Sequence, residues 1–303
     1  MPVPAPHADL LAAADIREHE ATLLGSRTRY WEYGPADAAT TVVAVHGYRG
    51  EHHGLEPVIV RLDGVRVVSP DLPGFGESTP MTEAEHSIAG YGAWLRALLD
   101  HLGVAGSAVV LGHSFGSIVV AHAVANGLPA PSVILVNPIA RDAAGATGVG
   151  ATRFFYGVAR MLPERAARAW LSNPLVVRGM SVALAQTLDP DLRRWIHGQH
   201  HDYFSRFSTR DSVVEGFDAS LSTSVLAVAD RITQPVLLVA GEKDGIAPLD
   251  GQFELLDTLP DARLDVIPDV GHLIHYETPV AAAAAIGAFL DGDGAPAGPA
   301  ADG

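Results

Sequence analysis

The sequence predicts an α/β protein in which a mostly parallel, doubly wound sheet carries an inserted helical cap. Short, almost continuously apolar runs recur along the 303 residues. Such runs are typical of strands buried on both faces of a parallel sheet. Stretches with helical spacing separate them, so strands and helices alternate. Residues 139–222 keep the helical patterns but contain no further buried run.

Each predicted strand follows from its local composition. Residues 21–35 predict two short strands around Gly25 and Ser26. The nearly continuous apolar runs lie at residues 41–45, 65–70, 108–112, 133–136 and 236–240, with a weaker one at residues 263–267. These runs predict the central strands of the sheet.

Three helices are predicted between and after these strands. Apolar side chains at helical spacing mark residues 83–102, and Gly103 is placed to end that helix. A second helix is expected over residues 114–126, closed by Gly127, and a last one over residues 279–290.

The interruption of the alternation defines the expected domains. Residues 1–138 and 223–290 form the two parts of the core, and residues 139–222 form the helical cap, which is rich in aromatic side chains. The tail, residues 291–303, is rich in Gly, Ala, Pro and Asp and is expected to be disordered.

Composition excludes several classes of protein. The chain has no cysteine, which rules out disulfides, catalytic thiols and cysteine-ligated metals. Its 20 basic and 35 acidic residues give a net charge of −15, so nucleic acid and membrane surfaces are poor partners. No apolar run is long enough to span a bilayer, and the first 20 residues lack the pattern of a secretory signal. We therefore expect a cytoplasmic protein and a neutral or apolar small-molecule substrate.

A serine stands where a nucleophile is expected. The motif Gly112-His113-Ser114-Phe115-Gly116 follows a buried strand and opens a helix. A turn that raises the serine hydroxyl above the sheet needs small residues on both sides, because larger ones would clash with the neighbouring strand and helix. Ser114 is therefore the candidate nucleophile.

A base and an acid follow Ser114 in the order that this architecture predicts. Asp244 lies just past the strand at residues 236–240, and His272 lies just past the last strand. Both positions are at carboxyl ends of strands, where open parallel sheets bind ligands. His272 would take the serine proton and Asp244 would orient the imidazole. Asp142 is the alternative acid.

The developing oxyanion needs fixed hydrogen-bond donors. The backbone N–H of Phe115, at the positive end of the helix, is the first expected donor. The loop His46-Gly47-Tyr48-Arg49-Gly50 follows the strand at residues 41–45, and the N–H of Tyr48 is the second expected donor.

Together, these motifs resemble the α/β-hydrolase superfamily, in the branch with a helical cap that contains esterases, carbon–carbon bond hydrolases, epoxide hydrolases and haloalkane dehalogenases. The resemblance covers about residues 21–290. Besides the segments already named, it rests on residues 71–78, which read Asp-Leu-Pro-Gly-Phe-Gly-Glu-Ser, and on Gly271-His272 followed by Glu277 and Pro279. In the family the segment matching residues 71–78 shapes the loop beside the active site.

The resemblance implies acyl chemistry. The related epoxide hydrolases and dehalogenases attack with an aspartate, whereas this chain carries Ser114. We therefore expect a serine hydrolase of the carboxylesterase type, without cofactor or metal, acting as a monomer or homodimer. The same residues also fit cleavage of a carbon–carbon bond, lyase chemistry without an acyl-enzyme, or a non-catalytic protein that only binds a ligand.

Substrate-binding residues carry no motif. Arg49 follows the oxyanion loop and is a candidate for binding a substrate carboxylate, although a surface arginine paired with an acid is the competing expectation. Some of the aromatic side chains of the cap are expected to face the substrate; the candidates are Phe154, Phe155, Trp170, Trp195 and Tyr203.

Several histidines lie close to one another in the sequence. His197, His200, His201 and Asp202 have a metal-like spacing, but no further ligand completes a site, and a solvated face is expected. His52 and His53 are likewise expected at the surface.

Overall fold

The computed structural model of the chain describes residues 5–142 and 149–292. Eight strands form one sheet in the order β1-β2-β4-β3-β5-β6-β7-β8. They are β1 (Ile16–Leu23), β2 (Ser26–Tyr33), β3 (Thr40–Val45), β4 (Val65–Pro70), β5 (Val109–His113), β6 (Val133–Val136), β7 (Val236–Gly241) and β8 (Ala262–Ile267). Strands β1 and β2 pair antiparallel, as do β2 and β4, and all other neighbours are parallel. The predicted mostly parallel α/β sheet is confirmed.

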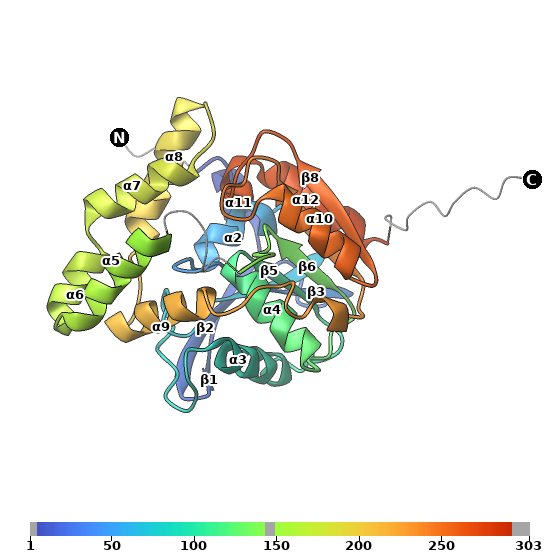
Figure 1. Cartoon of the computed structure of the whole chain (residues 1–303). Coiled ribbons are helices and arrows are strands. Elements are labelled where there is room, and N and C mark those ends of the chain that lie inside the picture. The colour runs from blue at the N-terminus through green and yellow to red at the C-terminus, as the bar shows by residue number, and fades with distance from the viewer. Residues whose placement is uncertain (1–4, 143–148, 293–303) are drawn as a thin grey trace, which may run out of the picture.

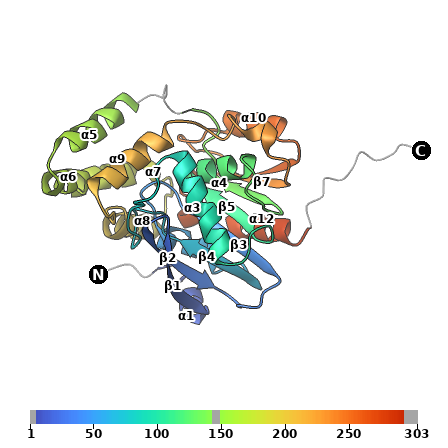
Figure 2. The same cartoon turned by 90° about the horizontal axis from the view of Figure 1, so that it is seen from below.

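Helices cover both faces of this sheet (Figure 1). Those of the core are α1 (Ala8–Ala13), α2 (His52–Ile59), α3 (Ile88–His101), α4 (Phe115–Ala125), α10 (Leu249–Thr258), α11 (Ile274–Glu277) and α12 (Pro279–Leu290), with a short 3₁₀ turn η2 (Ala229–Arg231). Buried side chains of α3, α4 and α10 pack on one face, and those of α2, α11 and α12 pack on the other. Figure 2 shows α3 lying over the strands.

The alternation of strand residues explains why the apolar runs are continuous. In β3, Val43 and Val45 belong to the core on one face, and Val42 and Ala44 belong to the core on the other. All four side chains are buried. A strand with helices on both sides has no solvated face, so it carries no polar alternation.

Two elements differ in extent from the prediction. Strand β1 begins at Ile16, earlier than expected, because an antiparallel strand at the edge of a sheet keeps one solvated face and lacks a continuous apolar signal. Helix α3 begins at Ile88 instead of residue 83. Its true start is marked by Ser87, whose hydroxyl accepts a hydrogen bond from the N–H of Gly90.

A helical insertion lies between β6 and β7. Its helices are α5 (Val149–Met161), α6 (Glu164–Leu171), α7 (Pro174–Leu184), α8 (Pro190–Tyr203) and α9 (Arg210–Ser220). In both views these helices lie together at one side of the sheet (Figures 1 and 2). The N–H of Gly76 donates to the carbonyl of Arg206, and Phe75 forms a β-bridge with Phe207. The insertion is therefore held against the loop of residues 71–78.

Two further findings complete the fold. None of the helices within residues 5–142 and 149–292 is long and apolar enough to cross a membrane. The tail expected to be disordered lies outside the described residues from position 293 onward.

Candidate active site

Ser114 occupies a sharp turn between β5 and α4. Its φ is 53°, a conformation that costs a non-glycine residue energy and that occurs at functional sites. A Cβ on Gly112 would lie 2.4 Å from the carbonyl oxygen of Gly116, and one on Gly116 would lie 2.2 Å from that of Val45. Both flanking glycines are therefore required, because any side chain there would force the strand and the helix apart.

The structure brings Ser114, His272 and Asp244 together in one hydrogen-bonded chain. His272 Nε2 lies 2.8 Å from Ser114 Oγ, and His272 Nδ1 lies 2.7 Å from Asp244 Oδ2. An ionised carboxylate only accepts, so Nδ1 carries the proton and Nε2 is free to accept from the serine hydroxyl. The alternative acid, Asp142, is exposed at the surface, and the imidazole pairs with Asp244 instead.

Asp244 is held as a carboxylate. Its second oxygen accepts hydrogen bonds from the N–H groups of Ile246 and Ala247, at 2.8 and 3.0 Å. Burial alone would raise the pKa of Asp244, but the charge and hydrogen bond of His272 and these two amides outweigh burial and lower that pKa. An anion is therefore available behind the imidazole when it gains a proton.

Asn137 links the two loops that carry the acid and the base. It follows β6 with a φ of 44° and is completely buried. Its amide nitrogen donates to the carbonyl of His272 at 3.0 Å, and its amide oxygen accepts from the N–H of Gly241 at 2.9 Å. Sequence reasoning missed this residue, although a polar residue directly after a buried strand was an available signal.

The loop after β3 passes close to Ser114. A Cβ on Gly47 would lie 3.2 Å from that of Ser114, so the loop and the serine are in near contact. Within the described residues, the N–H groups of Tyr48 and Phe115 have no hydrogen-bond partner. Neither of the two N–H groups predicted as oxyanion donors is therefore paired with another group of the described chain.

A cavity of about 100 Å³ opens above Ser114 and His272. The loop of residues 46–51 forms one wall, and α2, α8 and α11 contribute the others. The remaining lining residues are Gly54, Leu55, His113, Gln199, His200, Tyr203, Phe204, Leu273, His275 and Tyr276. Most of these were not predicted, because the direction of a side chain on a packed helix carries no local signal.

The five aromatic residues predicted to face the substrate lie in different places. Tyr203 lines the cavity, whereas the other four candidates are not among its lining residues. Phe154 is 72% exposed, and Phe155 stacks on Trp170 with ring centres 5.3 Å apart. Trp195 is buried in a separate cluster with Leu273 and Tyr276.

Arg49 does not form the expected surface ion pair. Its side chain is buried, its Nε donates to the carbonyl of Phe204, and its Nη2 donates to that of Leu171. The guanidinium lies 4.3 Å from the ring centre of Phe204. The expectation of an exposed arginine is therefore wrong, because the loop turns this side chain towards the insertion.

The histidines of α8 are also more buried than expected. Ser181 Oγ lies 2.5 Å from His197 Nδ1 and 2.7 Å from His200 Nδ1, and all three residues are buried. Only His201 and Asp202 are solvated, and they pair with each other. The expected solvated face is wrong for His197 and His200, which pack α8 against α7.

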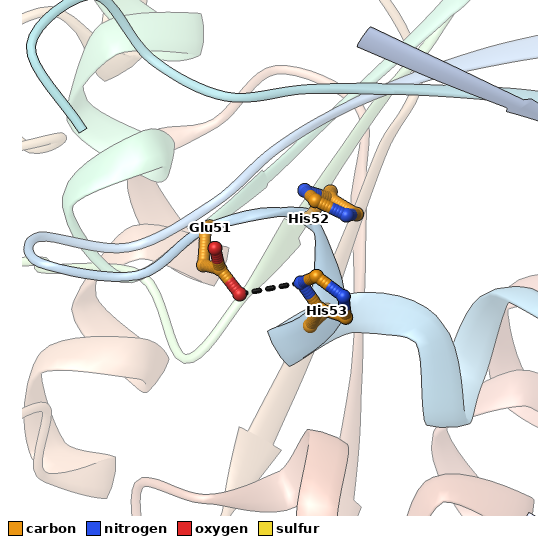
Figure 3. A group of neighbouring side chains, drawn as sticks. All are labelled: Glu51, His52 and His53. Carbon is orange, nitrogen blue, oxygen red and sulfur yellow. Dashed lines mark hydrogen bonds and ion pairs between the residues drawn. The ribbon is translucent and has the colours of Figure 1, made fainter. Parts of the chain in front are cut away.

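His52 and His53 are likewise not free surface residues. His52 is buried and its Nδ1 lies 2.8 Å from Asp71 Oδ1, while His53 Nδ1 lies 2.5 Å from Glu51 Oε1 (Figure 3). Potential ligand atoms of Glu51, His52 and His53 lie within 4.8 Å of one another. The hydrogen bonds to Asp71 and between Glu51 and His53 account for the ring positions.

Asp71 organises the loop that contains it. Its carboxylate is fully buried and accepts from the N–H groups of His52 and Glu77, at 2.9 and 2.7 Å. A Cβ on Gly76 would lie 2.1 Å from this carboxylate. These contacts agree with the loop-shaping role that the resemblance implies for residues 71–78.

The fold and the arrangement of these residues are those of an α/β hydrolase. The chain belongs to the alpha/beta hydrolase family, whose sequence profile matches residues 42–286.

Relatives of this chain carry different activities. It is 30% identical over 265 residues to the magnesium-chelatase 30 kDa subunit of Rhodobacter capsulatus, covering 85% of this chain and 88% of that one. It is 28% identical over 281 residues to 2-hydroxy-6-oxononadienedioate/2-hydroxy-6-oxononatrienedioate hydrolase 2 of Pseudomonas putida, covering 87% and 90%. The enol-lactonase of Burkholderia xenovorans superposes with a TM-score of 0.76 at 20% identity, over 90% of this chain and all of that chain. That last likeness shows the common fold.

Proposed function

We propose that the protein is a serine hydrolase that cleaves an ester-like bond of a small, largely apolar substrate. The observation that carries this proposal is the unbroken hydrogen-bonded chain from Ser114 through His272 to Asp244. The unoccupied N–H groups of Tyr48 and Phe115 beside it support the same reaction, because they are donors for a developing oxyanion.

The reaction follows from this geometry. His272 Nε2 accepts the hydroxyl proton while Ser114 Oγ attacks the carbonyl carbon, and the N–H groups of Tyr48 and Phe115 hold the negative oxygen. The imidazolium, stabilised by Asp244, then gives its proton to the leaving group. Water attacks the acyl-enzyme by the same route in reverse and releases the acid.

The cavity supports a small substrate. Its volume is about 100 Å³, and Leu55, Phe204, Leu273 and Tyr276 give it apolar walls. Residues of α8 line it from the side of the insertion, so the insertion acts as the cap over the acyl-binding pocket.

A second candidate function is cleavage of a carbon–carbon bond next to a carbonyl group. The relative from Pseudomonas putida that supports it is a hydrolase of dienedioate and trienedioate compounds by its name. The same serine, base and oxyanion donors would serve that reaction.

Activity profiling with a single control distinguishes these candidates. Purified protein is assayed with short-chain aryl esters, lactones, amides and vinylogous diketones, beside the Ser114→Ala variant. We expect hydrolysis of the short-chain esters that the variant loses while its melting temperature is kept. Turnover confined to the diketones would favour the second candidate, and inertness towards the whole panel would contradict both.

A further inference from the structure

The loop that carries the oxyanion donor Tyr48 is built as a tight turn. The N–H of Gly50 donates to the carbonyl of Gly47 at 3.0 Å, so Tyr48 and Arg49 are the two central residues. Arg49, at the second central position, has a φ of 57°. Turns with a positive φ at this position favour glycine, since a side chain there costs conformational energy. The arginine must therefore make contacts that offset this cost.

Those contacts all lie in the helical insertion. The Nε of Arg49 donates to the carbonyl of Phe204 at 3.2 Å, and its Nη2 donates to that of Leu171, at the end of α6, at 2.9 Å. The ring of Phe204 lies against the charge, and the side chain is only 2% exposed. Within the described residues no carboxylate pairs with this arginine, so backbone carbonyls and an aromatic face take that place.

The neighbouring Tyr48 is tied to the same insertion. Its hydroxyl donates to the carbonyl of Val213 in α9 at 2.7 Å. Its ring packs edge-on against Tyr156 of α5, with ring centres 5.9 Å apart. Both central residues of the turn thus contact the insertion, although the turn itself lies against Ser114 and the Tyr48 ring also packs on core rings.

We propose that Arg49 is a positioning residue that couples the docking of the insertion to the direction of the Tyr48 N–H. The inference rests on the proposed function, because it concerns the oxyanion donors of that reaction. The guanidinium holds the turn in its strained conformation, and that conformation leaves the Tyr48 N–H unpaired beside the serine. Arg49 thereby acts through Tyr48.

The matched control is Arg168 on α6. Its guanidinium donates to the carbonyls of Phe207 and Ser208 and lies 4.7 Å from the ring centre of Phe207. It therefore makes the same kinds of contact with the same stretch of the insertion. It does not belong to the turn at residues 47–50, and its contacts lie within the insertion, so its loss removes contacts of the same kinds and leaves both anchors of Arg49 in place.

The experiment compares Arg49→Gly with Arg168→Ala. Arg49→Gly removes the anchor, and because glycine populates positive and negative φ about equally, nothing then holds the turn in the conformation that directs the Tyr48 N–H. Steady-state kinetics are measured with p-nitrophenyl acetate, whose small acyl group contacts little of the insertion. The inhibition constant of a trifluoromethyl ketone is measured in parallel, because its serine adduct carries an oxyanion.

For Arg49→Gly we expect kcat to fall about 10- to 100-fold, with KM changed less than about 2-fold and the inhibition constant raised by a similar factor to the loss in kcat. Arg168→Ala should lower the melting temperature and keep kcat within about 2-fold. A kcat of Arg49→Gly within 2-fold of the wild type, or an equal loss in both variants, would overturn the coupling. A wild type without Ser114-dependent turnover would overturn the proposed function, and this inference with it.

Discussion

The ends of the parallel strands and the helical insertion both contribute to the cavity, but they do so in different ways. Ser114, Asp244 and His272 follow three strands whose carboxyl ends meet at one edge of the sheet. Two of their loops are further fixed by the side chain of Asn137. The insertion instead offers side chains from packed helices, and of its five predicted aromatic contacts only Tyr203 lines the cavity.

The difference shows which part of a site depends on local chemistry. At the strand ends, steric limits on Gly112 and Gly116 and a continuous hydrogen-bonded chain fix each functional group. In the insertion, position depends on how whole helices pack. We therefore expect substitutions at the strand ends to act on the rate of the chemical step, and those in the insertion to act on substrate binding.

The largest effect is expected from loss of the base. His272→Gln should lower kcat by about 10⁴-fold or more, because the serine then has no proton acceptor. His201→Gln, in the insertion, removes an exposed histidine and should leave kcat within about 2-fold. Steady-state kinetics on an aryl ester measure both. Equal losses in the two variants would remove the distinction between the regions.

The second-largest fall in kcat is expected from loss of the acid. Asp244→Asn should lower kcat by about 10³- to 10⁴-fold, because an amide favours the wrong tautomer of His272. Asp142→Asn, at the alternative acid, should leave kcat within about 2-fold. The same assay checks both variants, and a severe loss in Asp142→Asn with activity retained in Asp244→Asn would reverse the assignment.

Sequence predicted the strand-end residues because each has a local cause. A continuous apolar run marks a buried strand. The backbone around Gly112, Gly116 and Gly241 has no room for a side chain, so glycine is needed there and marks these turns in the sequence. The edge strand β1 and the start of α3 were less well predicted, because a solvated face and a serine cap give weak signals.

The lining of the cavity could not be predicted, because the direction of a side chain on a helix depends on how that helix packs. Phe154 and Tyr156 are two residues apart on α5, yet Phe154 is 72% exposed and Tyr156 is 3% exposed. Only the packing of α5 against its neighbours decides which of them is covered. The burial of Arg49 depends similarly on contacts with Leu171 and Phe204, far along the chain.

The strand-end region should also make the protein sensitive to acid. Burial, followed by the charge of His272, lowers the pKa of His113 from 6.5 to about 3. Between these values the unfolded chain binds a proton that the folded chain does not, so stability is lost as the pH falls below about 6.5. At pH 5 this histidine alone accounts for a loss of about 2 kcal/mol.

Urea unfolding at pH 8 and pH 5 measures this contribution. In His113→Gln the loss of unfolding free energy between the two pH values should be smaller than in the wild type by about 2 kcal/mol. His201→Gln should keep the wild-type loss, since His201 is exposed. An unchanged pH dependence in His113→Gln would show that the pKa of this histidine is the same in the folded and unfolded states, which would contradict the account.

The smallest kinetic effects are expected from substitutions in the insertion. Tyr203→Ala removes a wall of the cavity and should raise KM for a short-chain ester about 3- to 10-fold, with little change in kcat. Phe154→Ala truncates an exposed ring and should change neither constant by more than about 1.5-fold. A larger effect from Phe154 than from Tyr203 would mean that substrate enters or binds elsewhere on the insertion.

Covalent labelling with a fluorophosphonate, followed by intact-mass and peptide mass spectrometry, tests the central claim most directly. Each region offers a serine hydrogen-bonded to histidine, Ser114 at a strand end and Ser181 in the insertion. The account predicts a single adduct on Ser114 that is lost in Ser114→Ala and kept in Ser181→Ala. An unlabelled wild type, or an adduct that persists in Ser114→Ala, would contradict it.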